Sequence, residues 1–116
     1  MKNISRSTVN KAMQKLSLML LLPLTVYAAD ADFSLVIKDH KFQPAELVVP
    51  AGKKIKLIVE NQDATPEEFE SHALNREKII AGNAQATIYI GPLLPGKYPF
   101  FGEFNQATAQ GFIVAR

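Results

Sequence analysis

Residues 53–61 read KKIKLIVEN, and the alternation in this stretch decides the fold class of the chain. Ile55, Leu57 and Val59 occupy every second position, whereas the positions around them are mostly polar. Because successive side chains of a β-strand point to opposite faces, this period of two predicts a strand with one apolar face and one face mostly in water. The chain is therefore expected to be built from strands that each bury one face.

Other stretches show similar short apolar runs, separated by Pro and Gly. The predicted strands are residues 32–39, 45–49, 53–61, 67–72, 84–90, 96–104 and 110–115. Turn signals at residues 50–52 (PAG) and 94–97 (LPGK) join consecutive strands. Only residues 75–80 look briefly helical. We therefore expect one all-β domain, a sandwich of about seven strands.

The first 28 residues have the pattern of a secretory signal peptide. Basic residues precede the apolar run 16–24, and a Val-x-Ala sequence ends at Ala28. The basic residues are Lys2, Arg6, Lys11 and Lys15. A membrane anchor is the alternative, but the run has only about half of the roughly 20 apolar residues that a bilayer needs. We expect cleavage after Ala28, a periplasmic mature domain of residues 29–116, and no stable membrane insertion after cleavage.

Composition limits the chemistry of this mature domain. The chain has no Cys, and its three Met residues all lie in the first 28 residues. Without that segment, nine basic residues stand against eleven acidic ones, so the formal net charge changes from +2 to −2. A basic surface for nucleic acid is therefore not expected. Any bound metal has oxygen ligands, with nitrogen from His, which favours a hard or borderline ion.

Three segments resemble, in the expected order, the cupredoxins, which are the small Greek-key β-sandwiches of blue-copper proteins. They are residues 42–53 (FQPAELVVPAGK), 61–69 (NQDATPEEF) and 94–101 (LPGKYPFF). The resemblance spans nearly the whole mature domain and implies a cupredoxin-like Greek-key fold. In that family, the second segment supplies the first histidine ligand of copper, and the third leads into the loop with the other ligands.

The same resemblance indicates that the blue-copper ligands are missing. Gly102 stands at the position of the Cys, Asn105 at that of the second His, and Thr108 at that of the Met. The first His corresponds to Glu67 or Glu68, and both assignments stay open at this point. Because an electron-transfer copper needs the Cys thiolate, copper is expected, if at all, only in a centre other than type 1.

Acidic residues gather in the two segments that a cupredoxin brings together at its ligand end. If residues 67–72 form a strand, then Glu68, Glu70 and His72 share one face. Carboxylates with an imidazole suit a hard or borderline cation, of which iron is the one we expect. The predicted metal ligands are Glu68, Glu70, His72, Glu77 from the following segment, and Glu103 from the ligand-type loop. The alternative for each is an ordinary solvated surface residue.

A narrower resemblance points to iron uptake. The motif PEEFE at residues 66–70, followed by Arg76-Glu77, is similar to the cupredoxin domain of periplasmic EfeO-type iron-uptake proteins. The same motif and the loop 101–111 (FGEFNQATAQG) are similar to the small free-standing cupredoxins of Ftr-type ferrous-iron transport systems.

The chain also departs from these groups. Free-standing members often carry His where this chain has Asn105, and the EfeO-type domain has Cys where it has Phe42 and Gly102. Only the carboxylate part of such a site carries over, namely Glu68, Glu70 and Glu77.

The function that this resemblance implies is a periplasmic iron-binding accessory protein of a ferrous or ferric iron uptake system. Its expected partners are an inner-membrane iron permease and other periplasmic uptake components. We expect a binding protein rather than an enzyme, one that at most assists the oxidation of ferrous iron. The alternative is a metal-free cupredoxin-fold interaction domain of an exported complex.

Overall fold

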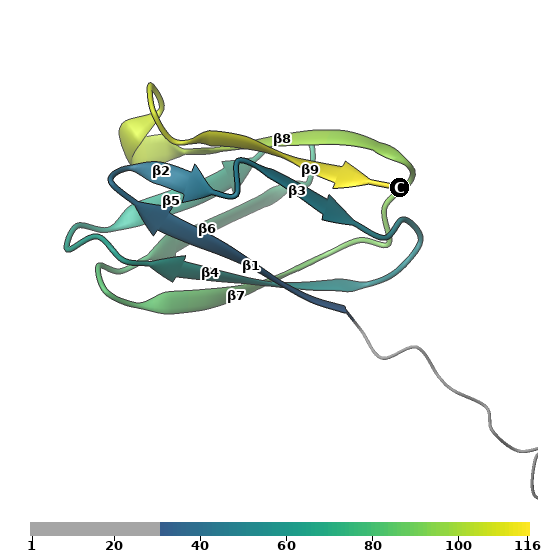
Figure 1. Cartoon of the computed structure of the whole chain (residues 1–116), viewed down its shortest axis with the longest axis horizontal. Helices are drawn as coiled ribbons and strands as arrows, with labels where there is room; N and C mark the ends of the chain where they lie inside the picture. Colours follow the sequence, from purple (N-terminus) through teal and green to yellow (C-terminus); the bar gives the residue numbers. More distant parts are fainter. Residues whose placement is uncertain (1–30) are drawn as a thin grey trace, which may run out of the picture.

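The computed structural model describes residues 31–116, which form nine β-strands and one short 3-10 helix (Figure 1). The predicted signal peptide, residues 1–28, lies outside the described residues. The elements are β1 (Ala31–Lys38), β2 (Lys41–Gln43), β3 (Glu46–Val49), β4 (Ile55–Asn61), β5 (Glu67–Ser71), β6 (Arg76–Ile80), β7 (Gln85–Ile90), β8 (Gly96–Gly102), the 3-10 helix η1 (Glu103–Asn105) and β9 (Gln110–Ala115). The predicted all-β class is confirmed.

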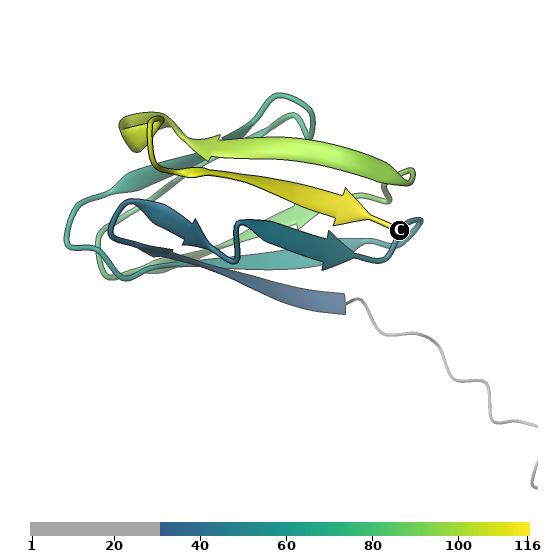
Figure 2. The same ribbon diagram turned by 45° about the horizontal axis from the view of Figure 1, so that its top comes forward.

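The strands form two sheets that face each other as a Greek-key sandwich (Figures 1 and 2). One sheet has the strand order β2-β1-β4-β7, and the other has the order β3-β9-β8-β5-β6. The pairs β1–β4 and β3–β9 are parallel, and the remaining pairs are antiparallel. The helix η1 lies at the end of the sandwich opposite to the C-terminus (Figure 1).

The core lies between the two sheets and follows the alternation read from the sequence. Ile55, Leu57 and Val59 are fully buried on the inner face of β4. Within this core, three Phe rings pack together from β2, β5 and β8. The ring centroids are 6.1 Å apart for Phe42–Phe69, 4.9 Å for Phe42–Phe100 and 5.1 Å for Phe69–Phe100. These ring contacts join β5 and β8 to β2 of the other sheet.

The prediction of a brief helix at residues 75–80 is wrong, because these residues form the edge strand β6. The chain turns after His72, with Asn75 in the left-handed region at a φ of 53°. It then pairs antiparallel with β5, so that Glu70 lies opposite Glu77. A helix of only six residues is unstable in isolation, and the ladder to β5 supplies backbone partners that such a helix lacks.

The described residues also contain nine strands rather than about seven, because β2 was missed together with β6. A two-residue turn joins β1 to β2, and Asp39 and His40 both have positive φ, at 52° and 57°. The Asp63 carboxylate accepts hydrogen bonds from both backbone N–H groups of this turn, at 2.8 and 3.0 Å. These bonds, that of His40 first, lower the pKa of Asp63.

The one helix among residues 31–116 is η1, with three residues. No helix of this part of the chain is therefore long and apolar enough to cross a membrane.

Candidate functional site

The strand β5 presents two different faces. Glu67, Phe69 and Ser71 are buried and point between the sheets, whereas Glu68 and Glu70 are half-buried on the outer face. The alternation of a strand thus separates the two adjacent glutamates that the sequence left undecided. Glu67 is the inward residue at the end where the resemblance places copper ligands, and Glu68 belongs to the outer surface.

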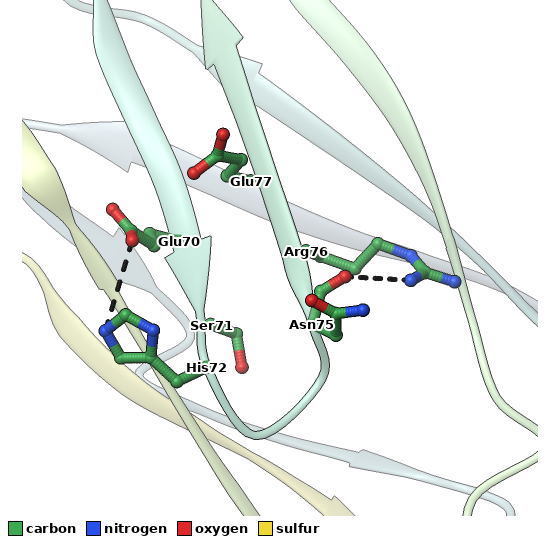
Figure 3. Close-up of a pocket in the computed structure, with 6 residues that line it drawn as sticks. All are labelled: Glu70, Ser71, His72, Asn75, Arg76 and Glu77. Atoms are coloured by element: carbon green, nitrogen blue, oxygen red, sulfur yellow. Dashed lines mark hydrogen bonds and ion pairs between the residues drawn. The ribbon is translucent and has the colours of Figure 1, made fainter.

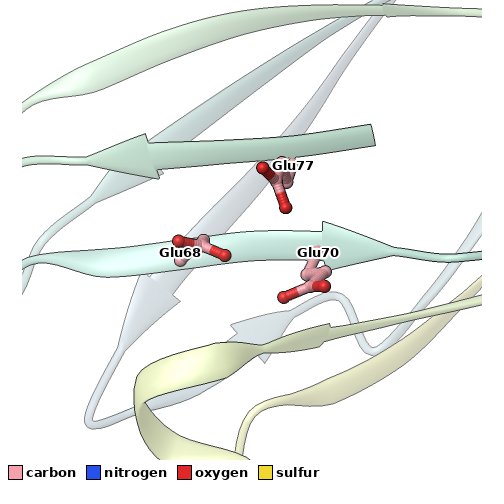
Figure 4. Close-up of side chains that lie close together, drawn as sticks. All are labelled: Glu68, Glu70 and Glu77. Atoms are coloured by element: carbon pink, nitrogen blue, oxygen red, sulfur yellow. The ribbon is translucent and has the colours of Figure 1, made fainter. Parts of the chain in front are cut away.

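On the outer face, three carboxylates from two strands converge (Figure 4). Glu68 and Glu70 come from β5, and Glu77 comes from β6, directly opposite Glu70. One carboxylate oxygen from each of the three lies within 4.8 Å of the others. We call Glu68, Glu70 and Glu77 the acidic cluster.

The other two predicted ligands lie beside Glu70. His72 follows β5, and its Nε2 is 4.0 Å from Glu70 Oε1 (Figure 3). The pKa of Glu70 is raised, first because the carboxyl is partly withdrawn from water and then because of its contact with Glu103 and the proximity of Glu68. The structure thus places the other four predicted residues around Glu70, and the binding of a metal by the five stays a prediction.

Glu70, Ser71, His72, Asn75, Arg76 and Glu77 line an open hollow of about 380 Å³ (Figure 3). The Arg76 guanidinium points away from the carboxylates, because Nε donates to the backbone oxygen of Tyr89 at 2.8 Å and Nη1 to that of Asn75 at 2.9 Å. Within residues 31–116, the His72–Glu70 contact is the only ion-pair contact of 4.0 Å or less. No Lys or Arg of the described chain therefore neutralises the acidic cluster at contact distance.

The raised pKa of Glu70 gives a pH prediction. A carboxyl that holds its proton more tightly in the folded state adds stability below its ordinary pKa of 4.5, and this contribution is lost as the pH rises through the raised value. In chelator-treated wild-type protein, this loss lowers the melting temperature between pH 4.5 and 7. We expect the Glu70→Gln variant to show a smaller decrease over this range and to have a higher melting temperature than wild type at pH 7. Glu46→Gln, at an exposed position of β3, should keep the wild-type profile. Identical profiles for all three proteins would contradict the prediction.

The inner position, where the resemblance places copper ligands, is filled by protein atoms. Glu67 is 1% exposed, and its carboxylate accepts hydrogen bonds from backbone and side-chain N–H groups near η1. A Cβ added at Gly102 would lie only 2.7 Å from Glu67 Cδ. Thr108 Oγ1 donates to the backbone oxygen of His40 at 2.7 Å. These residues offer no thiolate, imidazole or thioether, so they do not fit type 1 copper.

Comparisons with known proteins agree with this fold. Residues 12–115 match the model of the family described as "Cupredoxin-like domain". An uncharacterized protein of Rickettsia prowazekii (strain Madrid E) is 53% identical over 83 residues, which cover 72% of this chain. The chain spans just under two thirds of that relative, at 66% of its length.

Solved structures show the same architecture at low sequence identity. Auracyanin A, a blue copper protein from Chloroflexus aurantiacus, superposes with a TM-score of 0.66 at 14% identity, covering 76% of this chain and 100% of its own. A purple cupredoxin from Nitrosopumilus maritimus gives a TM-score of 0.55 at 14% identity, covering 72% of this chain and 98% of its own. At this identity, the likeness shows the fold alone. With the family match over nearly its whole length, the chain belongs to the cupredoxin-like family.

Proposed function

We propose that this protein is a periplasmic accessory protein of an iron uptake system that binds iron through the acidic cluster. The observation that carries the proposal is the convergence of three carboxylates within 4.8 Å without a Lys or Arg of the described chain at contact distance. Like charges at this separation repel one another. A bound cation would remove that repulsion. Its further ligands in this proposal are Glu103 and His72, which both contact Glu70.

The donor set favours iron over softer ions. Carboxylate oxygens suit hard cations, and one imidazole nitrogen extends the range to borderline divalent ions. Fe2+ and Fe3+ both fall within this range. The position outside the cytoplasm rests on the signal-peptide pattern of residues 1–28, and the link to an inner-membrane iron permease rests on the resemblance of residues 66–70 and 101–111 to EfeO-type and Ftr-type proteins. In this role the protein receives and passes on the ion, and it at most assists ferrous oxidation.

A thermal-shift titration tests this proposal. The purified protein is melted with Fe2+ under anaerobic conditions, with Fe3+ as its citrate complex, and with Mn2+ and Cu2+ for comparison. An ion at 100 times its dissociation constant stabilises the folded state by about 2.7 kcal/mol, so iron is expected to raise the melting temperature by several degrees.

The variant Glu70→Gln/Glu77→Gln should lose this gain, and Glu46→Gln should keep it. The proposal fails if no ion raises the melting temperature of the wild-type protein, or if the double variant responds as the wild type does.

A metal-free interaction domain is the second candidate. It is favoured by a hollow of about 270 Å³ lined in part by Phe101 and Phe112, because the Phe112 ring is 45% exposed on β9. Partly exposed aromatic side chains are enriched at protein interfaces. A melting temperature that no ion changes would support this second function instead.

A further inference from the structure

Glu67 is a buried carboxylate whose hydrogen bonds all come from within the described chain. Its Oε1 accepts from the backbone N–H of Glu68 at 3.0 Å and from that of Phe104 at 2.9 Å. Its Oε2 accepts from Asn105 Nδ2 at 2.7 Å. A carboxylate taken out of water is costly unless such donors replace the water. N–H bonds to an ionised oxygen are also stronger than those between neutral groups. We call these three hydrogen bonds the Glu67 clamp.

The clamp fits a space that Gly102 provides. A Cβ at this position would lie 2.7 Å from Glu67 Cδ and 2.9 Å from Oε1. Gly102 is also the last residue before η1. The absence of a side chain at residue 102 therefore lets the carboxylate of β5 reach the backbone of η1.

Each backbone donor of the clamp belongs to, or follows, a residue of the proposed ion site. One donor is the N–H of Glu68, a member of the acidic cluster. Another is the N–H of Phe104, the residue after Glu103, whose carboxylate lies beside Glu70. Figure 4 shows the yellow segment that contains η1 passing beside β5, on the side of Glu68 and Glu70. The Glu67 carboxylate thus binds the backbone at two residues, Glu68 and Phe104, that belong to or follow the outer site.

We propose that Glu67 is the positioning residue of the acidic cluster: from inside the sandwich, its carboxylate fixes the backbone of Glu68 and the η1 segment that carries Glu103. The inner carboxylate closes the end of the sandwich at which the related fold would bind copper, and the ion-binding groups lie on the outer face instead. The effect on ion binding rests on the proposed function, whereas the anchoring of η1 does not.

A swap of donor and acceptor tests the clamp. Asn105→Asp places a second carboxylate against Glu67, where repulsion replaces a hydrogen bond. In the double variant Glu67→Gln/Asn105→Asp, the new amide oxygen can accept from the two backbone N–H groups, and the new amide nitrogen can donate to the new carboxylate. The pair keeps one negative charge. The hydrogen bond between residues 67 and 105 is restored with reversed polarity, and the two backbone hydrogen bonds keep their direction.

Two readouts are measured on each protein at neutral pH. Mn2+ serves as an air-stable probe, and its dissociation constant is obtained from the electron paramagnetic resonance signal of the free ion. The exchange rate of the Phe104 amide proton, followed by nuclear magnetic resonance, reports the anchoring of η1 without any ion. Leu35→Ala, in the core of the other sheet, is the control for a loss of stability alone.

We expect Asn105→Asp to weaken Mn2+ binding about tenfold and to expose the Phe104 amide to exchange. The double variant should return both values to within about threefold of wild type. Leu35→Ala should lower the melting temperature and leave the Mn2+ affinity of the folded protein unchanged. Unaltered Mn2+ affinity in Asn105→Asp, or no recovery in the double variant, would overturn the positioning role.

The two proposals fail separately. If the wild-type protein binds neither Mn2+ nor iron, the proposed function is wrong, and the Phe104 exchange rates then decide whether Glu67 anchors η1. If the wild type binds Mn2+ and the Phe104 amide exchanges equally fast in wild type and Asn105→Asp, the ion site stands and the clamp does not.

Discussion

Gly102→Val is expected to lower the free energy of unfolding by about 4 kcal/mol, which combines the usual cost of overpacking with that of broken buried hydrogen bonds. A Cβ at Gly102 would lie 2.7 Å from both Glu67 Cδ and the Cβ of Ala109. The Glu67 carboxylate cannot move aside without leaving the Phe104 N–H and the Asn105 amide unpaired. Urea unfolding followed by circular dichroism measures the loss. Because small domains are stable by only about 5–15 kcal/mol, this variant should unfold at much lower urea.

A double-mutant cycle identifies the cause of this loss. Glu67→Ala removes the group that the new side chain would strike, so Glu67→Ala/Gly102→Val should lose at least about 1 kcal/mol less than the sum of the single variants. Ala107→Val creates the same side chain by adding two carbons, against three in Gly102→Val, at an exposed position, and should change stability by no more than about 0.5 kcal/mol. Additive losses in the cycle would show that Gly102 and Glu67 do not share one packed position.

The fold could be read from the sequence because most strands bury one face. The predicted strand at residues 53–61 became β4, and that at residues 110–115 became β9 with the same bounds. The two missed strands lack this signal. In β6, which reads REKII, only Ile80 is buried. The position of this strand is fixed by its pairing with β5 rather than by an apolar pattern of its own. The strand β2 has three residues, too few to show a period.

The sequence predicted part of the outer site. A strand that contains Glu68 and Glu70 places both on one face, and the structure has them there. The position of Glu77 depends on the antiparallel register that sets it opposite Glu70. No periodicity in the chain specifies that register, so the sequence placed Glu77 only in the segment after the strand of Glu68 and Glu70, and the structure has it on β6.

The role of Glu67 could not be read from the sequence, although one signal was present. Glu67 and Phe69 are two positions apart and share one face of a strand, so a strand that buries Phe69 also turns Glu67 inward. Two of the three partners of its carboxylate, however, come from residues 37 and 38 positions later in the chain. A buried carboxylate is tolerated only with such donors, and only the folded structure brings them together.

The core beneath the acidic cluster yields the second large effect. Phe69→Ala is expected to lower the free energy of unfolding by about 4 kcal/mol, through lost apolar burial and the cavity left behind. The Phe69 side chain is fully buried, and its ring stacks on Phe100 at 5.1 Å and meets the edge of Phe42 at 6.1 Å. Such ring pairs add to the burial term. Chemical unfolding monitored by far-ultraviolet circular dichroism gives the difference.

Phe104→Ala is the matched control, because this ring is 50% exposed on η1 and its removal should cost less than about 1 kcal/mol. Equal losses for the two variants would mean that Phe69 is not the central core residue. The backbone of β5 stays paired with β6 and β8 in either variant, so Glu68 and Glu70 keep their outward face. Iron should therefore raise the melting temperature of folded Phe69→Ala by as many degrees as it raises that of wild type, because the core sets the stability of β5 and the strand register sets its carboxylates.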